Sequence, residues 1–268
     1  MTAITSPIQR FTPASAVEGH AVSDALTIAW RNLVNLRRSP QLLVFATIQP
    51  VIFVLLFRYV FGGAIRVTGF RYVDFLMPGI FAQTITFGAI NTGVGLAEDL
   101  NKGLIDRFRS LPMARSAVLI GRTVADVARN VFVVTLMVIV GFMVGFRIHT
   151  NALGLIAGVA LMLLFSFSLS WIFATIGLAI GNAEAAQAAS FPILAPLTFA
   201  SSAFVQTSSM PGWLQGFAKH QPVTVTVDAV RALCLGGPTT GKVLAAVAWC
   251  VGIVAVFAPL AVRRYRNS

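Results

Sequence analysis

Long apolar segments without charge dominate this chain, and they restrict its fold more than any other feature. Residues 152–180 contain no charged side chain, and five other stretches of the 268-residue chain are nearly as apolar. A helix of about 20 apolar residues is long enough to cross the hydrocarbon core of a bilayer. Only 11% of the residues are charged, against about 25% in an ordinary soluble domain. The sequence therefore predicts an all-α membrane protein.

Six transmembrane helices follow from the positions of these stretches. The predicted spans are 41–61, 75–97, 119–146, 152–180, 188–205 and 243–262. A soluble catalytic domain needs roughly 100 residues, and no segment between two spans is that long. The chain is therefore expected to have no energy-converting domain of its own, with a single transmembrane domain over residues 23–266.

The region before the first span has two parts. Residues 1–22 are polar and are expected to form a disordered cytoplasmic tail. Residues 24–38 repeat apolar side chains such as Trp30 and Val34 at helical spacing, with polar side chains on the other side. This pattern predicts an amphipathic helix that lies in the membrane interface.

The charge balance indicates the orientation. There are 20 Lys and Arg against 9 Asp and Glu, a net charge of +11. In a membrane protein, basic residues mark the cytoplasmic loops and meet anionic lipid, so membrane lipids are expected partners and nucleic acid is not. Thirteen of the 20 basic residues lie before residue 41, between 98 and 129, or after 262. Both termini are therefore predicted to be cytoplasmic.

The densest group of charges follows the second span, at residues 98–112. Two acids, Glu98 and Asp99, stand where the helix leaves the membrane, and Gly103 is expected to end it. Beyond this glycine, apolar residues recur at helical spacing among charges up to Leu111. The pattern predicts a short amphipathic helix that offers a polar face to a soluble partner. The alternative is an ordinary solvated loop.

Several motifs together resemble the ABC-2 family of transporter permeases, in particular the actinobacterial daunorubicin- and doxorubicin-resistance type. The resemblance covers about residues 26–266. The residues that carry it are Glu98 with Arg107-x-x-Ser110-Leu111-Pro112, then Gly121-Arg122, Val144-Gly145-Phe146-Arg147, Pro211-Gly212-Trp213-Leu214, His220-Gln221-Pro222-Val223 and Ala229-x-Arg231-Ala232.

The resemblance implies a multi-pass permease of the cytoplasmic membrane with the six-span architecture of ABC-2, or type V, exporters. Such a subunit takes part in drug efflux, antibiotic resistance or lipid export. It pairs with a second permease, identical or related, and docks two copies of a separate ABC ATPase. ATP and magnesium would be bound by that partner, and no cofactor is expected in this chain. The implied ATPase-coupling residues are Trp30, Arg31, Arg38, Glu98, Asp99, Gly103, Asp106, Arg107, Arg109, Leu111 and Pro112.

The segment between the fifth and sixth spans is predicted to form two short helices, starting near Pro211 and at Pro222. Neither is long enough to span the membrane, and both are expected to be interfacial. In the resembled family this segment is re-entrant and helps form the exit, which assigns exit roles to Trp213, Pro222 and Arg231. The alternative is an ordinary loop on the far side of the membrane.

Polar residues inside otherwise apolar and aromatic spans are candidates for the substrate path. They either hydrogen-bond between helices or line the cavity that the resembled family forms from its first, second and fifth spans. The candidate path residues are these polar side chains together with aromatic side chains of the same spans: Gln49, Phe53, Gln83, Phe87, Asn91, Phe199, Ser201 and Ser202. Such walls suit an amphiphilic or lipid-like substrate better than a sugar or an ion.

Other patterns in the sequence favour a structural role over a catalytic or metal-binding one. Residues 236–242 match G-x-x-x-x-G-K, but a phosphate-binding loop needs a Ser or Thr next and a preceding strand, so a turn into the last span is expected. Pairs of glycines four apart, such as Gly177 and Gly181, allow close packing of helices, within this chain or between two copies. The three histidines are scattered, which argues against a metal site or a catalytic triad.

The runner-up function is an integral membrane lipid-modifying enzyme. Such an enzyme needs acids or histidines gathered at one membrane face, and Glu98-Asp99 is the only adjacent acidic pair. A passive channel is a third possibility, but the spans show no charged ring. The sequence thus favours an exporter permease that is not itself an enzyme.

Overall fold

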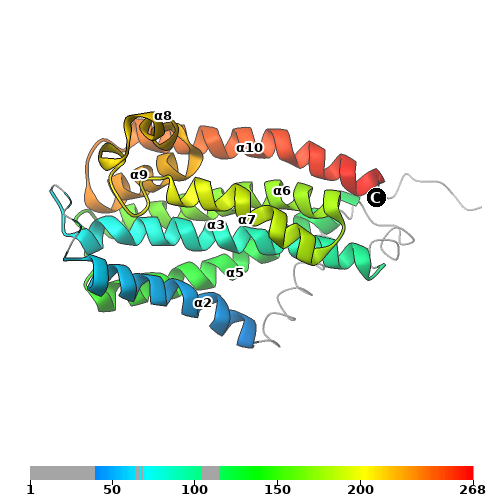
Figure 1. Cartoon of the computed structure of the whole chain (residues 1–268), viewed down its shortest axis with the longest axis horizontal. Coiled ribbons are helices and arrows are strands. Elements are labelled where there is room, and N and C mark those ends of the chain that lie inside the picture. Colours follow the sequence, from blue (N-terminus) through cyan, green and yellow to red (C-terminus); the bar gives the residue numbers. More distant parts are fainter. Residues whose placement is uncertain (1–39, 64, 66, 68, 104–114, 268) are drawn as a thin grey trace, which may run out of the picture.

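The computed structural model describes residues 40–63, 65, 67, 69–103 and 115–267. Throughout these ranges every regular element is a helix, and the long helices run side by side in one bundle (Figure 1). The all-α prediction is confirmed for this part of the chain. The predicted tail 1–22, the amphipathic helix 24–38 and the cluster residues 104–112 lie outside the described residues.

Four helices are long and apolar enough to cross a membrane. They are α3 (Tyr72–Asn101), α5 (Arg115–Val144), α6 (Ala152–Ile180) and α10 (Thr240–Asn267). They stand where the second, third, fourth and sixth spans are predicted. For the fourth span the observed and predicted bounds coincide, because Asn151 caps its first turn and Gly181, at a φ of 69°, ends it.

The first and fifth predicted spans correspond to shorter helices. The first is α2 (Pro40–Leu55), which continues into the π-helical segment η1 (Leu56–Phe61). Its described apolar part, Thr47–Phe61, is below the length of a full span. The fifth is α7 (Ala183–Phe199), of 17 residues. The structure thus has four helices of membrane-crossing length and two shorter ones among the six predicted positions.

Helix α7 differs from the predicted range 188–205 at both ends. It begins directly after the turn because the side chain of Asn182 accepts a hydrogen bond from the backbone N–H of Ala185, at 3.0 Å. It ends at Phe199 because the next backbone groups bind side chains of another helix. The N–H of Ser202 donates to the hydroxyl of Thr224, and the carbonyl of Ala203 accepts from Arg231.

Helix α3 lies at the centre of the bundle, and 83% of its most apolar 18-residue stretch is buried. Glycines allow this close packing. A Cβ atom at Gly177 of α6 would lie 2.1 Å from the carbonyl oxygen of Gly93 on α3. In the same way, the backbone at Gly154 lies against the carbonyl of Leu233. Gly177, the first glycine of the pair with Gly181, and Gly154, which stands four residues before Gly158, therefore pack within the chain.

The segment between α7 and α10 forms α8 (Gly212–His220) and α9 (Pro222–Leu235). Helix α8 is exposed, with the Trp213 side chain 81% accessible. Helix α9 is buried against α3, α6 and α10. Its side chains Val223, Val227 and Val230 are buried, and the helix lies within the end of the bundle rather than on its surface.

The bundle has two distinct ends (Figure 1). Helices α8 and α9 lie at one end, with the first turns of α3 and α10; we call it the α9 end. The last turns of α3 and α10 lie at the other, which we call the Glu98 end. At the α9 end, Gly236 and Gly237 adopt φ of 99° and 117° just before α10 starts, so residues 236–239 form the predicted turn and residues 240–242 already belong to α10.

Candidate functional site

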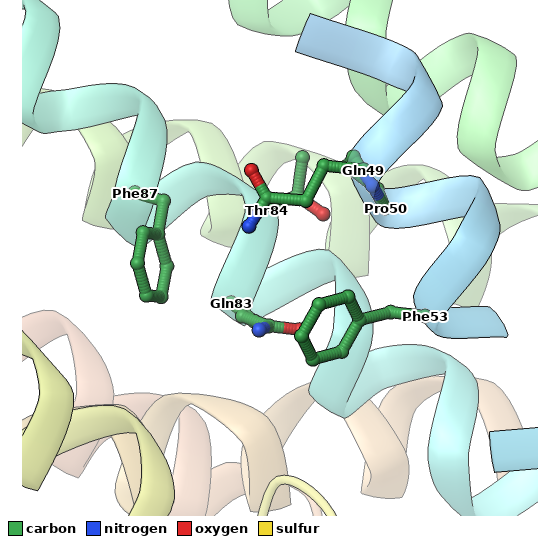
Figure 2. A pocket seen from close by; sticks show the side chains of 6 residues that line it. All are labelled: Gln49, Pro50, Phe53, Gln83, Thr84 and Phe87. Carbon is green, nitrogen blue, oxygen red and sulfur yellow. The ribbon is translucent and has the colours of Figure 1, made fainter. Parts of the chain in front are cut away.

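A pocket of about 250 Å³ lies between α2 and α3. Six side chains line it, and Figure 2 shows Gln49 close to Thr84 and Phe53 close to Gln83, with the Phe87 ring to one side. We call it the α2–α3 pocket; its residues are Gln49, Pro50, Phe53, Gln83, Thr84 and Phe87. Four of these were predicted from the sequence to line the substrate path. The structure therefore brings together half of that predicted set.

The side chains of the α2–α3 pocket differ in how freely they can turn toward a ligand. Gln83 is 4% exposed, whereas Gln49 is exposed. The hydroxyl of Thr84 donates to the carbonyl of Ile80 at 2.8 Å, so its own helix satisfies it. The two glutamine amides, one on each helix, can therefore donate and accept hydrogen bonds across the pocket.

A second hollow extends from this pocket toward α7, with about 990 Å³ of empty space that is open to the surroundings. It shares Gln49 and Phe87 with the α2–α3 pocket. We call it the α7 hollow; its residues are Gln49, Phe87, Ile90, Asn91, Gln187, Ala188 and Phe191. The rings of Phe87 and Phe191 meet edge to face at 6.3 Å. Asn91, another predicted path residue, thus lines a hollow that shares two residues with the pocket.

Phe199 contacts the pocket only through other rings. It stacks on Phe204 at 5.8 Å, Phe204 stacks on Phe57 at 4.7 Å, and Phe57 lies 6.0 Å from Phe53 of the pocket. This series of rings runs from the α2–α3 pocket toward the α9 end. An apolar molecule could follow it along the bundle.

Ser201 and Ser202 lie away from both hollows. They are 0% and 4% exposed and bind protein groups. The hydroxyl of Ser201 donates to the carbonyl of Thr198 at 2.5 Å, and that of Ser202 donates to Asp228 at 2.8 Å. Ser202 thus hydrogen-bonds to another helix, which was the alternative interpretation of these polar residues, whereas Ser201 hydrogen-bonds within the end of its own segment.

Arg231 holds the α9 end together. Its Nε donates to the carbonyl of Phe75 at 2.9 Å, and its charged group lies 3.5 Å from the centre of the Phe75 ring. Its other nitrogens bind Asp228, Ser202 and the carbonyl of Ala203 at 3.0 to 3.1 Å. Burial lowers the pKa of Arg231 to about 10, so it stays charged at neutral pH. Of the other predicted exit residues, Trp213 is exposed on α8 and Pro222 starts α9.

Charged side chains join α3 to α5 at the Glu98 end. Asp99 on α3 pairs with Arg122 on α5 at 2.5 Å, while Glu98 pairs with the nearby Lys102 on the surface at 3.4 Å. Gly103, at a φ of 64°, ends the helix as predicted. The other predicted coupling residues lie outside the part of the chain that the structure describes: Trp30, Arg31, Arg38, Asp106, Arg107, Arg109, Leu111 and Pro112.

The charges on α5 continue into the bundle. Asp126 and Arg129 pair at 3.6 Å, as their spacing predicts. Arg129 also donates to the carbonyl of Gly88 on α3 at 2.8 Å, and the hydroxyl of Thr92 binds both Asp126 and, at 3.2 Å, Ser170 on α6. Paired charges of this kind are tolerated inside an apolar bundle, and here they connect three helices.

The sequence reasoning missed two acids. Asp74 is fully buried, pairs with Arg71 at 3.0 Å and accepts the backbone N–H of Arg147 at 2.8 Å. Its position one residue before the predicted second span was the available signal. Asp228 is the partner of Arg231, and its place three residues earlier repeats the spacing of the Asp126 pair.

Comparison with known proteins extends over most of the chain. Residues 24–235 match the family described as ABC-2 type transporter. The chain is 38% identical over 250 residues to the daunorubicin resistance ABC transporter permease protein DrrB1 of Streptomyces coeruleorubidus, covering 92% of this chain and 88% of that protein. It is 30% identical over 190 residues to the doxorubicin resistance ABC transporter permease protein DrrB of Mycobacterium tuberculosis, covering 71% and 65%. A probable doxorubicin resistance permease, DrrC, of the same species is 26% identical over 225 residues, covering 83% and 81%. The matched family range includes every residue that lines the α2–α3 pocket and the α7 hollow.

Proposed function

Since the chain belongs to the ABC-2 type transporter family, it is the permease subunit of an ATP-binding-cassette exporter, and we propose that it moves an amphiphilic, drug-like or lipid-like molecule out across the cytoplasmic membrane. A permease subunit is not itself catalytic. The observation that carries the substrate class is the pair of adjacent hollows between α2, α3 and α7, in which amide side chains stand among aromatic rings.

The chemistry of the hollows supports an amphiphile. Among the described residues, those that line the hollows are apolar, aromatic or uncharged polar side chains, which suit an amphiphile. Phe53, Phe87 and Phe191 offer ring faces and edges to a planar apolar body. Gln49 and Gln83 offer the few polar contacts that orient a ligand in an apolar site. The names of the relatives refer to daunorubicin and doxorubicin resistance, and doxorubicin is therefore a suitable test substrate.

Transport in inside-out vesicles that contain this permease and its ATPase tests the assignment. Phe87→Ala removes a ring from both hollows, and an aromatic contact contributes about 1 kcal/mol. The half-saturating doxorubicin concentration should therefore rise about fivefold. Phe132→Ala is the matched control, because Phe132 is an exposed ring on α5 that lines neither hollow. Equal changes in the two variants would contradict the proposed path.

A separate ATPase would drive the transport. We infer that two copies dock at the Glu98 end, that a second permease, identical or related, completes the transporter, and that both chain termini face the cytoplasm. ATP and magnesium would be held by the ATPase. The Asp99–Arg122 ion pair supports docking at the Glu98 end, because it links the last turn of α3 to α5. A displacement of the segment after Gly103 by the docked ATPase would thus move α3 and α5 together.

Coupling can be tested separately from insertion. Glu98→Gln and Arg107→Gln should each reduce drug-stimulated ATP hydrolysis by the assembled transporter, while the amount of permease in the membrane stays unchanged. Glu184→Gln is the control, because Glu184 is an acid at the start of α7 and is not a predicted coupling residue. Undiminished stimulation in both test variants would refute the docking assignment.

A further inference from the structure

A second polar pocket, separate from the α2–α3 pocket and the α7 hollow, opens at the α9 end with about 510 Å³ of empty space. We call it the α9 pocket. One part of its wall is apolar and includes Phe70, Phe75 and Leu235. The other part is charged, with Asp228 and Arg231 from α9 and Lys242 from the first turn of α10. An apolar wall next to opposite charges suits a molecule with an apolar body and a charged head.

The three charged side chains, Asp228, Arg231 and Lys242, differ in how many of their hydrogen-bonding groups remain available to a ligand. The Arg231 side chain is 9% exposed and its nitrogens already bind four protein groups, so it serves to position Asp228. The Asp228 side chain is 39% exposed, and its bonds to Arg231 and Ser202 both use Oδ1. A carboxylate has about four acceptor sites on its two oxygens. Asp228 can therefore still accept hydrogen bonds from a cationic donor in the pocket.

Lys242 supplies the complementary contact. It is exposed, and its side chain lines the same pocket as Asp228. Because Arg231 and Asp228 neutralise each other, Lys242 leaves the pocket with one net positive charge. An ammonium group of this kind binds phosphate well as a point charge. The pocket thus offers one site for a phosphate, one acceptor for an ammonium and an apolar wall.

We propose that the α9 pocket binds the phosphoethanolamine headgroup of a membrane phospholipid, with the phosphate at Lys242, the primary ammonium at Asp228 and the lipid chain against Phe70 and Leu235. A primary ammonium donates hydrogen bonds to a carboxylate, whereas a choline headgroup has no N–H to donate. A glycerol headgroup has no positive charge to place beside Asp228. The pocket should therefore discriminate among lipids by their headgroups. This inference is independent of the proposed drug path.

Lipid retention by the full-length permease tests the site. The purified chain is placed in nanodiscs with equal amounts of phosphatidylethanolamine, phosphatidylcholine and phosphatidylglycerol, then extracted and analysed by native mass spectrometry. We expect phosphatidylethanolamine to be retained about tenfold over phosphatidylcholine, the effect of one charge-assisted hydrogen bond. Glycerophosphoethanolamine, which has no acyl chains, should not be retained. Equal retention of the three lipids would overturn the proposal, and retention of the chain-free headgroup would overturn its assignment to a lipid.

Matched variants locate the binding to this pocket. Lys242→Gln should lower phosphatidylethanolamine retention about fivefold, while Lys219→Gln, at the exposed last turn of α8, should leave it unchanged. Asp228→Asn should abolish the preference over phosphatidylcholine. Because Asp228 also pairs with Arg231, thermal melting of this variant shows whether it is folded, and Lys242→Gln carries the test if it is not. Retention by Lys242→Gln equal to that by Lys219→Gln would refute the site.

Discussion

The contact between Gly177 and Gly93 gives a prediction that can be worked out from the structure. A Cβ atom at position 177 would lie 2.1 Å from the carbonyl oxygen and 2.8 Å from the Cα of Gly93. Ordinary contacts of a Cβ atom begin at 3.4 Å. Gly177→Ala therefore requires α6 to move away from α3 by about 1.3 Å. The atoms in the way belong to the backbone, so no side-chain rotation can relieve the clash.

The energetic consequence follows from what over-packing does in other cores. Forcing one extra carbon into a filled site destabilises a protein by about 1–3 kcal/mol. Alanine favours a helix over glycine by up to about 1 kcal/mol, so the net loss should be about 1–2 kcal/mol. For a chain of this size, that lowers the melting temperature by about 2–8 °C.

Thermal melting of the purified permease in detergent measures this effect, with tryptophan fluorescence as the readout. Trp171 is buried on α6, the helix that must move. Gly252→Ala is the matched control, because Gly252 is also inside a helix and no atom lies within 4 Å of a Cβ placed there. If the two variants melted at the same temperature, the close approach of α3 and α6 would be wrong.

Three other substitutions test polar contacts between helices. Arg231→Met removes four hydrogen bonds, two of them to the backbone carbonyls of Phe75 and Ala203, so we expect about 1–3 kcal/mol of destabilisation; unchanged melting would contradict these contacts. Asp74→Asn removes the charge that holds the backbone N–H of Arg147, so this amide should exchange its hydrogen about tenfold faster. Unaltered exchange would show that the carboxylate does not hold this turn. Asn130→Ala breaks a buried hydrogen bond to α6 and should cost about 1–3 kcal/mol; a melting temperature equal to wild type would argue against that bond.

Local patterns in the sequence were sufficient for many elements. The period of apolar residues located the helices, Pro222 marked the first turn of α9, and a spacing of three residues paired Asp126 with Arg129. Half of the substrate-path candidates, chosen as polar or aromatic residues in apolar spans, do line the α2–α3 pocket. The predictions of helix positions, of the start of α9 and of the Asp126–Arg129 pair succeeded because each depends on residues within one helical turn or one apolar run.

Contacts between distant segments could not be predicted in this way. The partner of Asp99 is Arg122, 23 residues later on another helix. The pairing depends on how α3 and α5 are rotated about their axes, and no local spacing records that rotation. Gln187 and Phe191 were missed for the same reason, since only the placement of α7 beside α3 brings them to the hollow.

The sequence by itself determined that this protein is a helical membrane permease, because uncharged apolar runs have few other stable states in a bilayer and because its motifs resemble those of ABC-2 permeases. The tertiary structure decided where the apolar runs end and what their polar residues do. Helix α7 stops at Phe199 because α9 supplies partners for the following backbone groups. Ser202 contributes to a buried ionic cluster and Gln83 to an open pocket. Both are polar side chains in apolar surroundings, and only the neighbouring helices distinguish them.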